Sequence, residues 1–339
     1  MTRILRDADL VDPGSLREIV DRIEAGYRVD AEGGVVGIPR ARREAGGVTL
    51  AWLGASIPSM DLVGFRSYLY RSDGYDRGEQ IVALYRATTM ELRGLCLGRE
   101  VGQIRTGAAI AAAIHLVDPG LRTIGLIGTG VQARRALASL GSVLRLDRVL
   151  AWSPTPSHRE AFRAWSKSTL GLSVDLLASA TEVAHDAPAL VLTSSSESPV
   201  VTRESLGAPK LLVSISGYRR PEIDVTVLDA APQVWTDSVE QAGAPGTLFE
   251  DPRRRAKLRP LGAAVADGSA FSTDAHRIIL NTGAAWQEVL VADLLLQRAA
   301  RMGHGTELPL PAPHNPGVGE AGAPRALDAT SWTEAPRPG

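Results

Sequence analysis

The spacing of apolar and polar positions divides the chain at about residue 122. Beyond that point, short apolar runs alternate with helix-forming stretches. Strand–helix alternation of this kind predicts an α/β fold with a parallel, doubly wound sheet. The expected strands are 123–127, 148–152, 172–176, 189–193 and 210–215, and the expected helices between them are 132–144, 157–168 and 180–185.

The first third of the chain does not alternate in this way. Apolar residues recur at helical spacing in 12–30, which predicts an amphipathic helix. Four apolar runs separated by Gly, Pro, Ser and Asp predict short strands over 48–53, 62–70, 80–85 and 92–97. We therefore expect a separate α+β unit before the alternating region.

Four further segments complete the pattern. Residues 99–117 are dominated by small helix formers and predict a tightly packed helix. Residues 243–273 are rich in Gly, Pro, Arg and Ala and predict a long connection. A final helix is expected over 284–302. Residues 303–339 contain many Pro, Gly and Ala, and they predict a mobile tail.

One strand–helix junction carries a glycine pattern with chemical meaning. Gly128 would allow a tight turn, Gly130 would let the backbone approach phosphates, and Ala133 would permit close helix–strand packing. Free N–H groups at the start of the following helix would bind the phosphates. An ordinary glycine-rich strand–helix turn is the alternative. The predicted pyrophosphate site comprises Gly128, Thr129, Gly130, Val131, Gln132 and Ala133.

The composition excludes several other classes of protein. The 339 residues, 44% hydrophobic and 22% charged, suit a globular protein of two domains. A net charge of −1 gives no basic field for nucleic acid or an anionic membrane. No transmembrane run or secretory signal is recognisable, so the expected location is the cytoplasm. Cys96 is predicted to be buried and inert, and the scattered histidines predict no metal site.

Two segments together resemble one family. Arg105-Thr106-Gly107-Ala108-Ala109, followed by 127–133, is similar to the signature of the ornithine cyclodeaminase/mu-crystallin family. The resemblance runs from about residue 12 to about residue 302. It implies a homodimer of two-domain subunits. The substrate-binding and dimerisation domain would comprise 1–120 with 284–302, the Rossmann-type NAD(P)-binding domain 121–283, and the tail 303–339.

Arginines are the substrate ligands that this resemblance implies. Family members bind the substrate carboxylate with the arginine of the first segment, which is Arg105 here, with Thr106 beside it. A planar guanidinium suits this task because it forks onto both carboxylate oxygens. An earlier family arginine corresponds to Arg40 or Arg42, and we favour Arg40. The alternatives are a salt bridge for Arg105 and a solvated charge cluster for Arg40.

The chain departs from the family at two positions. Where the family usually has a lysine close to the reacting carbon, this chain has Arg66, which cannot donate a proton near neutral pH. Where cyclodeaminases carry an Asp after the fifth nucleotide strand, this chain has Tyr218. A phenol can donate a proton, but it is a poor base. The predicted catalytic residues are therefore Arg105, Arg66 and Tyr218, with the alternative that Tyr218 merely lines the cleft.

The segment after the second nucleotide strand bears on the choice of dinucleotide. NAD-binding domains often place an acidic residue there to hold the ribose 2′-hydroxyl, whereas this chain has Ser153 and Thr155, with Arg159 soon after. Without the acid, nothing repels a 2′-phosphate, so the sequence favours NADP(H) over NAD(H). The other expected cofactor contacts are Thr193, Ser194, Asn281 and Gly283.

Three functions are compatible with the resemblance. The first, which we favour, is an NAD(P)H-dependent oxidoreductase that transfers hydride at the α-carbon of a small amino or imino acid. It would be an imine reductase or an amino-acid dehydrogenase. The second is conversion of L-ornithine to L-proline and ammonia with bound NAD, which Arg66 and Tyr218 disfavour. The third is a non-catalytic NADPH-dependent binding protein. The substrate side chain and the direction of reaction stay open.

Overall fold

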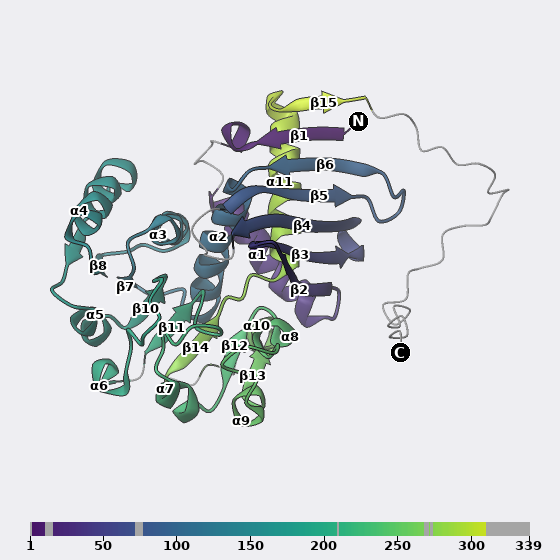
Figure 1. Cartoon of the computed structure of the whole chain (residues 1–339). Helices are drawn as coiled ribbons and strands as arrows, with labels where there is room; N and C mark the ends of the chain where they lie inside the picture. Colours follow the sequence, from purple (N-terminus) through teal and green to yellow (C-terminus); the bar gives the residue numbers. More distant parts are fainter. Residues whose placement is uncertain are drawn as a thin grey trace.

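Two β-sheets organise the protein (Figure 1). The computed structural model describes residues 2–10, 16–71, 77–208, 210–267, 271 and 274–309. One sheet is built mainly from the first third of the chain, and the other is built from residues 123–280. Residues 72–76, which include the charged residues Asp73 and Asp76, lie outside the described residues.

The first sheet has seven strands in the order β15-β1-β6-β5-β4-β3-β2. Neighbouring strands pair antiparallel, except that β1 and β6 are parallel. The strands are β1 (Thr2–Arg6), β2 (Val36–Ala45), β3 (Val48–Ile57), β4 (Leu62–Arg71), β5 (Arg77–Tyr85), β6 (Leu92–Leu97) and β15 (Thr306–Leu308).

Strand β15 corrects the prediction of a mobile tail over 303–339. Residues 306–308 pair with β1, so their backbone groups complete the edge of the sheet. Three residues are too few to show strand periodicity, which is why the sequence pattern missed them. Residues 310–339 lie outside the described part of the chain.

Helix α11 (Ala285–Met302) covers one face of the seven-stranded sheet, and α1 (Leu16–Ala31) packs against α11. Short 3₁₀ turns lie at Asp7–Leu10 and Pro58–Met60. Helix α11 is buried along most of its length, and a Cβ on Gly64 of β4 or Gly94 of β6 would clash with its side chains. The helix therefore lies almost directly on the strands. We call this covered side the inner face of the sheet.

The second sheet has eight strands, all parallel, in the order β13-β12-β14-β11-β10-β7-β8-β9. The predicted doubly wound parallel sheet is thereby confirmed. The chain order reverses between β7 and β10, which makes their carboxyl ends the switch point where ligands bind in such sheets. The strands are β7 (Thr123–Ile127), β8 (Arg148–Trp152), β9 (Val174–Leu176), β10 (Ala189–Leu192), β11 (Leu211–Ser214), β12 (Val234–Thr236), β13 (Leu258–Pro260) and β14 (Arg277–Leu280).

Helices cover both faces of this sheet, and α2 (Glu100–Val117) packs between it and the other half of the molecule (Figure 1). One hydrophobic core runs without interruption from the inner face of the first sheet through α1, α2 and α11 to the second sheet. The remaining helices are α3 (Val131–Val143), α4 (Pro156–Trp165) with a π-helical turn Ser166–Leu170, α5 (Ala180–Asp186), α6 (Arg203–Leu206), α7 (Val225–Ala230), α8 (Val239–Ala242), α9 (Pro252–Arg255) and α10 (Leu261–Asp267).

The expectation that 243–273 is a long connection is wrong in part. This segment contains α9, β13 and α10. Leu258, Leu261 and Ala264 are buried against the sheet and α1, so tertiary packing stabilises elements too short for a sequence period. Residues 268–270, 272 and 273 lie outside the described part.

Candidate functional site

The glycine turn after β7 has the geometry of a phosphate cradle. Gly128 has φ +106°, and a Cβ there would lie 2.8 Å from the carbonyl oxygen of Thr193, so only glycine fits. At Gly130, by contrast, a Cβ would meet open space, with no neighbouring atom within 4 Å. Gly130 is also the N-cap of α3, and it has no side chain that could hydrogen-bond to the N–H groups at the start of that helix. The helix N-terminus therefore opens onto free space that suits an anion.

Three predicted cofactor residues carry buried polar atoms without a partner in the described structure. They are the hydroxyl of Thr193, the side-chain oxygen of Gln132, and both the oxygen and the nitrogen of the Asn281 side-chain amide. Thr193 and Asn281 directly follow β10 and β14, at the same edge of the sheet as Gly128. Buried polar atoms normally have hydrogen-bond partners. These residues therefore fit a bound dinucleotide that supplies the missing hydrogen bonds.

The other predicted cofactor residues surround this turn. The hydroxyls of Thr129 and Ser153 hydrogen-bond to each other at 2.7 Å, which joins the glycine turn to the end of β8. Arg159 donates to the carbonyl oxygen of Leu177 at 3.3 Å, and Thr155 is exposed at the start of α4. Val131 is exposed at the start of α3, whereas Ala133 is fully buried.

Ser194 is held by a buried carboxylate that the sequence did not single out. Its backbone N–H and its hydroxyl both donate to Oε1 of Glu222, at 2.7 and 2.6 Å. Ser214 and Ser216 donate to the other carboxylate oxygen at 2.6 and 2.8 Å. Glu222 thus fixes the loops that follow β10 and β11, where they face the dinucleotide turn.

A second group of residues meets between the inner face of the first sheet and α11. Glu288 of α11 accepts a hydrogen bond from Nε of Arg105 at 2.7 Å and another from Nη1 of Arg66, both on Oε1. Nη2 of Arg66 donates to the side-chain oxygen of Gln80 on β5. Glu288, Arg105, Arg66 and Gln80 all have buried side chains. We call Arg66, Arg105 and Glu288, together with the partly buried Arg40, the arginine cluster.

Two glycines make room for the buried guanidinium groups. A Cβ on Gly102 of α2 would lie 2.6 Å from Nη2 of Arg66. A Cβ on Gly283, which has φ +79°, would lie 2.8 Å from both terminal nitrogens of Arg105. The predicted cofactor residue Gly283 therefore also shapes the space around Arg105.

The cluster carries more positive than negative charge. Burial raises the pKa of the Glu288 carboxyl, but the charges of Arg105 and Arg66 outweigh burial and hold that pKa below its ordinary value. Glu288 is therefore ionised and balances only one of the three guanidinium groups. Within the described part of the chain, Arg105 hydrogen-bonds only through Nε, and its two terminal nitrogens have no hydrogen-bond partner. They are free to bind a carboxylate in the forked geometry.

Arg40 connects the two halves of the molecule. The pairing of β2 with β3 is irregular between Ile38 and Ala41, and this bulge presents Arg40 on the inner face. Its Nη1 and Nη2 donate to the carbonyl oxygens of Thr282 and Gly283, at 3.2 and 3.1 Å. Arg40 is thus not part of a solvated charge cluster. It instead ties β2 of the first sheet to the loop before α11.

Tyr218 reaches the same region. Nη1 of Arg40 donates to its hydroxyl oxygen at 3.4 Å, a long hydrogen bond, and the ring is buried in the core of the nucleotide half. Thr106, in contrast, uses its hydroxyl hydrogen within its own helix, where it donates to the carbonyl oxygen of Gly102 at 2.7 Å. The geometry thus brings Arg40, Arg66, Arg105 and Tyr218 together. It leaves Thr106 able only to accept a hydrogen bond from a ligand.

Asp237 is a further residue that the sequence missed. Its carboxylate accepts hydrogen bonds from the backbone N–H groups of Thr282, Gly283 and Ala284, at 2.8 to 3.1 Å, and from the side chain of Gln287. The loop that contacts Arg40 and Arg105 is therefore rigidly positioned. No local motif marks Asp237, which lies 45 or more positions from its partners.

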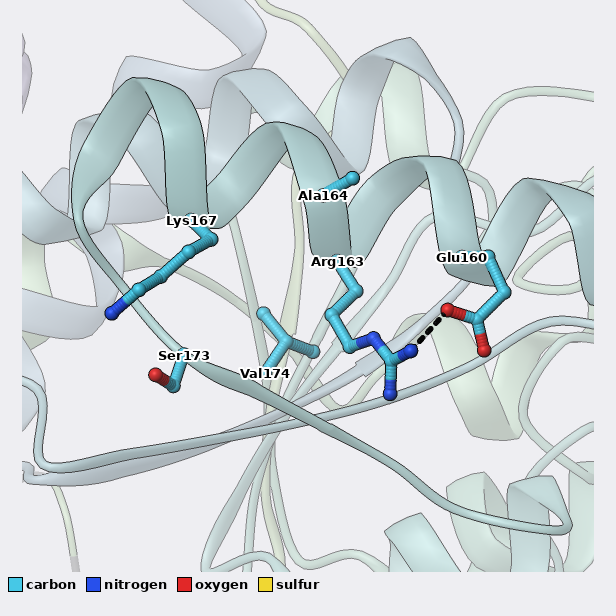
Figure 2. A pocket seen from close by; sticks show the side chains of 6 residues that line it. All are labelled: Glu160, Arg163, Ala164, Lys167, Ser173 and Val174. Carbon is cyan, nitrogen blue, oxygen red and sulfur yellow. Dashed lines mark ion pairs between the residues drawn. The ribbon is translucent and has the colours of Figure 1, made fainter.

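Other features of the structure lie away from these residues. A depression beside α4 and β9 is lined by Glu160, Arg163, Ala164, Lys167, Ser173 and Val174, and it contains none of the predicted site residues (Figure 2). Cys96 is buried, which raises the pKa of its thiol to about 12 and confirms the expectation of an inert cysteine. The described residues contain no group of side chains arranged to hold a metal ion. Within those residues, no helix is long and apolar enough to span a membrane.

Comparison with known proteins agrees with this architecture. Residues 3–300 match the ornithine cyclodeaminase/mu-crystallin family, and the chain belongs to that family. It is 26% identical to the iminosuccinate reductase of Paracoccus denitrificans over 243 residues, 68% of this chain and 73% of that protein. It is 25% identical to a Δ1-pyrroline-2-carboxylate reductase of Bacillus cereus over 240 residues, 67% of this chain and 73% of that protein.

Solved structures show the same fold. The Δ1-pyrroline-2-carboxylate reductase of Thermococcus litoralis, solved with NADH and L-proline, has a TM-score of 0.80 at 19% identity. The match covers 91% of this chain and all of that one. The iminosuccinate reductase of P. denitrificans, solved with NAD⁺, has a TM-score of 0.79 at 22% identity and covers 91% and 99% of the two chains. The second sheet with its helices accordingly has the fold of a Rossmann-type domain.

Proposed function

We propose that the protein is an NAD(P)H-dependent oxidoreductase that reduces the C=N bond of a small α-imino acid. The observation that carries this proposal is the excess of buried guanidinium groups, beside a nucleotide cradle with unsatisfied polar atoms. The curated relatives in the family are imine reductases, which supports the same reaction class. A reduced nicotinamide dinucleotide, when bound, supplies the hydride.

The residues of this chain would bind and orient the substrate. The free terminal nitrogens of Arg105 would bind the α-carboxylate. Glu288 orients that guanidinium by accepting a hydrogen bond from Nε of Arg105. Arg66 and Arg40 supply further positive charge close by, which stabilises an anionic substrate in a site shielded from water. The main contribution of the protein is thus positioning of the imino acid against the cofactor.

The direct test is consumption of NADPH and NADH with a panel of substrates. The panel contains cyclic imino acids, and α-keto acids mixed with ammonia or small amines. We expect turnover on a subset, whose common structure describes the pocket. Production of proline and ammonia from ornithine, without reduction of any imine, would instead indicate cyclodeamination. Tight NADPH binding with no turnover in either assay would indicate a binding protein.

We further propose that the preferred cofactor is NADP(H). The end of β8 carries Ser153 and Thr155 rather than an acid, with Arg159 on the following helix. Ser153→Asp would place a carboxylate beside the ribose, so we expect NADPH affinity to fall at least about tenfold while NADH affinity changes little. Ser173→Asp, in the depression of Figure 2, is the matched control. Wild-type enzyme that binds NADH more tightly than NADPH would contradict this preference.

We also propose that the protein is a homodimer formed through the uncovered face of the first sheet. That face exposes large apolar side chains, each 37–47% accessible, at Ile38, Val48, Leu50, Val63, Leu69 and Ile81. A contiguous apolar sheet face of this kind marks a protein contact. Leu50→Glu combined with Ile81→Glu should yield monomers in analytical ultracentrifugation, whereas Met90→Glu, on an exposed turn, should not. A monomeric wild type would refute the assignment.

A further inference from the structure

Tyr68 occupies the inner face of β4 beside the arginine cluster. Alternate residues of a strand face the same side, so Tyr68 points the same way as Arg66. Its register partners are Gln80 on β5 and Ala51 on β3, and Gln80 itself binds Arg66. The guanidinium carbon of Arg66 lies 4.8 Å from the centre of the Tyr68 ring. Tyr68 is therefore a member of the site that neither motif nor composition marked.

Positive charge surrounds the Tyr68 phenol from three elements. Arg40 and Arg42 face it from β2, Arg66 from its own strand, and Arg105 from α2. The nearby acid is Glu288 on α11, which is already paired with Arg66 and Arg105. Burial raises the pKa of the Tyr68 phenol, but these charges, led by that of Arg40, outweigh burial and bring the pKa below its ordinary value.

The hydroxyl of Tyr68 is available to a ligand. It makes no hydrogen bond within the part of the chain that the structure describes, although the side chain is only partly exposed. Tyr218 differs in this respect, since its hydroxyl oxygen already accepts a hydrogen bond from Arg40. Arg66 cannot supply a proton, because a guanidinium stays charged at any ordinary pH.

We propose that Tyr68 is the catalytic residue that protonates the imine nitrogen during reduction. The proposal rests on the proposed imine reductase function. Reduction adds a hydride to the imine carbon and a proton to its nitrogen. The O–H bond of Tyr68 breaks as the new N–H bond forms, and the pair of electrons stays on the phenolate oxygen. Arg40 and Arg66 stabilise that phenolate, and water returns the proton after product leaves.

The test removes only the hydroxyl, with Tyr68→Phe. Tyr70→Phe is the matched control, because Tyr70 lies two positions further along β4 with its ring centre 6.0 Å from that of Tyr68. We expect Y68F to lower kcat about a hundredfold at pH about 8, with KM changed less than about threefold. Y70F should retain wild-type kcat. A Y68F enzyme as active as Y70F would overturn the proposal.

The pH profile supplies a readout that a structural role would not change. A phenol donates only while protonated, so wild-type kcat should fall as pH rises through the lowered pKa of Tyr68. Y68F should lack that decline, and its deficit should shrink at low pH, where the imine arrives already protonated. Ultraviolet titration of tyrosinate in the unliganded enzyme should show an early-ionising phenol that Y68F removes and Y70F keeps.

Two other results would reject the assignment. If Tyr218→Phe abolishes the alkaline decline while Y68F preserves it, Tyr218 is the donor and Tyr68 is not. If the wild-type enzyme reduces no imine, the proposed function is wrong, and so is the proposed role of Tyr68. If only the assignment of Tyr68 is wrong, the result differs: wild type, Y70F and Y68F would all reduce the imine at the same rate.

Discussion

The nucleotide turn and the arginine cluster are the two sites at which we propose that anionic groups bind, yet they are built in opposite ways. The turn uses residues 128–133, which are contiguous, and it binds through backbone geometry and a helix end. The cluster uses side chains from β2, β4, α2 and α11, which span residues 40 to 288 of the chain. Its binding power comes from charges that burial keeps strong.

This difference affects how each site tolerates change. A local turn depends on one or two backbone angles, so a change there affects cofactor binding or the nearby backbone and leaves the cluster intact. An assembled cluster depends on every element that delivers an arginine, and each buried charge needs its partner. Substitutions at Arg105, Gly130, Gly128 and Asp30 therefore distinguish the two sites.

Arg105→Ala should have the largest effect. It removes the guanidinium that has free nitrogens for a carboxylate, and truncation of one member of a buried charge pair costs about 2–5 kcal/mol. We therefore expect kcat/KM to fall about a thousandfold, with NADPH affinity unchanged in a fluorescence titration. Arg105→Lys keeps a charge for Glu288 and controls for folding. The exposed Arg122→Ala should be silent. Unchanged turnover in the alanine variant would remove Arg105 from the site.

Gly130→Ala should impair the other site and leave the cluster intact. The space beside Gly130 is open and its φ is −80°, so alanine folds without strain. The added methyl group would stand where the backbone approaches the phosphates. We expect NADPH affinity to fall about tenfold, or 1.4 kcal/mol, with no change in melting temperature. Wild-type affinity in this variant would show that the phosphates do not bind at the turn.

Gly128→Ala should instead cost stability. Its positive φ and the Thr193 carbonyl oxygen 2.8 Å from a Cβ force either strain or a shift of β10. We expect a loss of about 2 kcal/mol in the free energy of unfolding, measured by urea denaturation. Gly171→Ala, which also has positive φ but open surroundings, is the control and should lose less. Equal losses of unfolding free energy in both variants would mean that the close approach of Gly128 to Thr193 does not contribute to the cost of the substitution.

Asp30→Asn tests the contact between the two halves and should have the smallest effect. Burial, with the nearby charge of Asp237, raises the pKa of Asp30 from 3.8 to about 6. Asp30 therefore costs no stability below pH 3.8, where it is protonated in the folded and the unfolded state, and it destabilises the fold increasingly as pH rises through about 6. Asp30→Asn should therefore melt at a higher temperature than wild type above pH 6 and at a similar temperature near pH 4. The exposed Asp21→Asn should show no such divergence with pH.

The sequence predicted the elements that repeat a period or end at a clear signal. The strands 123–127 and 148–152 match β7 and β8 residue for residue, and the small-residue stretch forms α2. The shortest elements were missed for one reason. Strand β15 and the elements within 252–267 have too few residues to show a period, and partners distant in the chain stabilise them.

The sequence by itself determined the family, the Rossmann-type unit and the residues of the nucleotide turn. A turn of six residues is a local object, so neighbouring side chains and backbone angles specify it. Only the tertiary structure decided which charged residues meet. Arg40, at a β-bulge, donates a hydrogen bond to Thr282. Arg66 and Arg105 share one oxygen of Glu288. Tyr68 lies beside Arg66 on the same strand. Distances between such residues depend on strand register and helix packing, which no stretch of sequence contains.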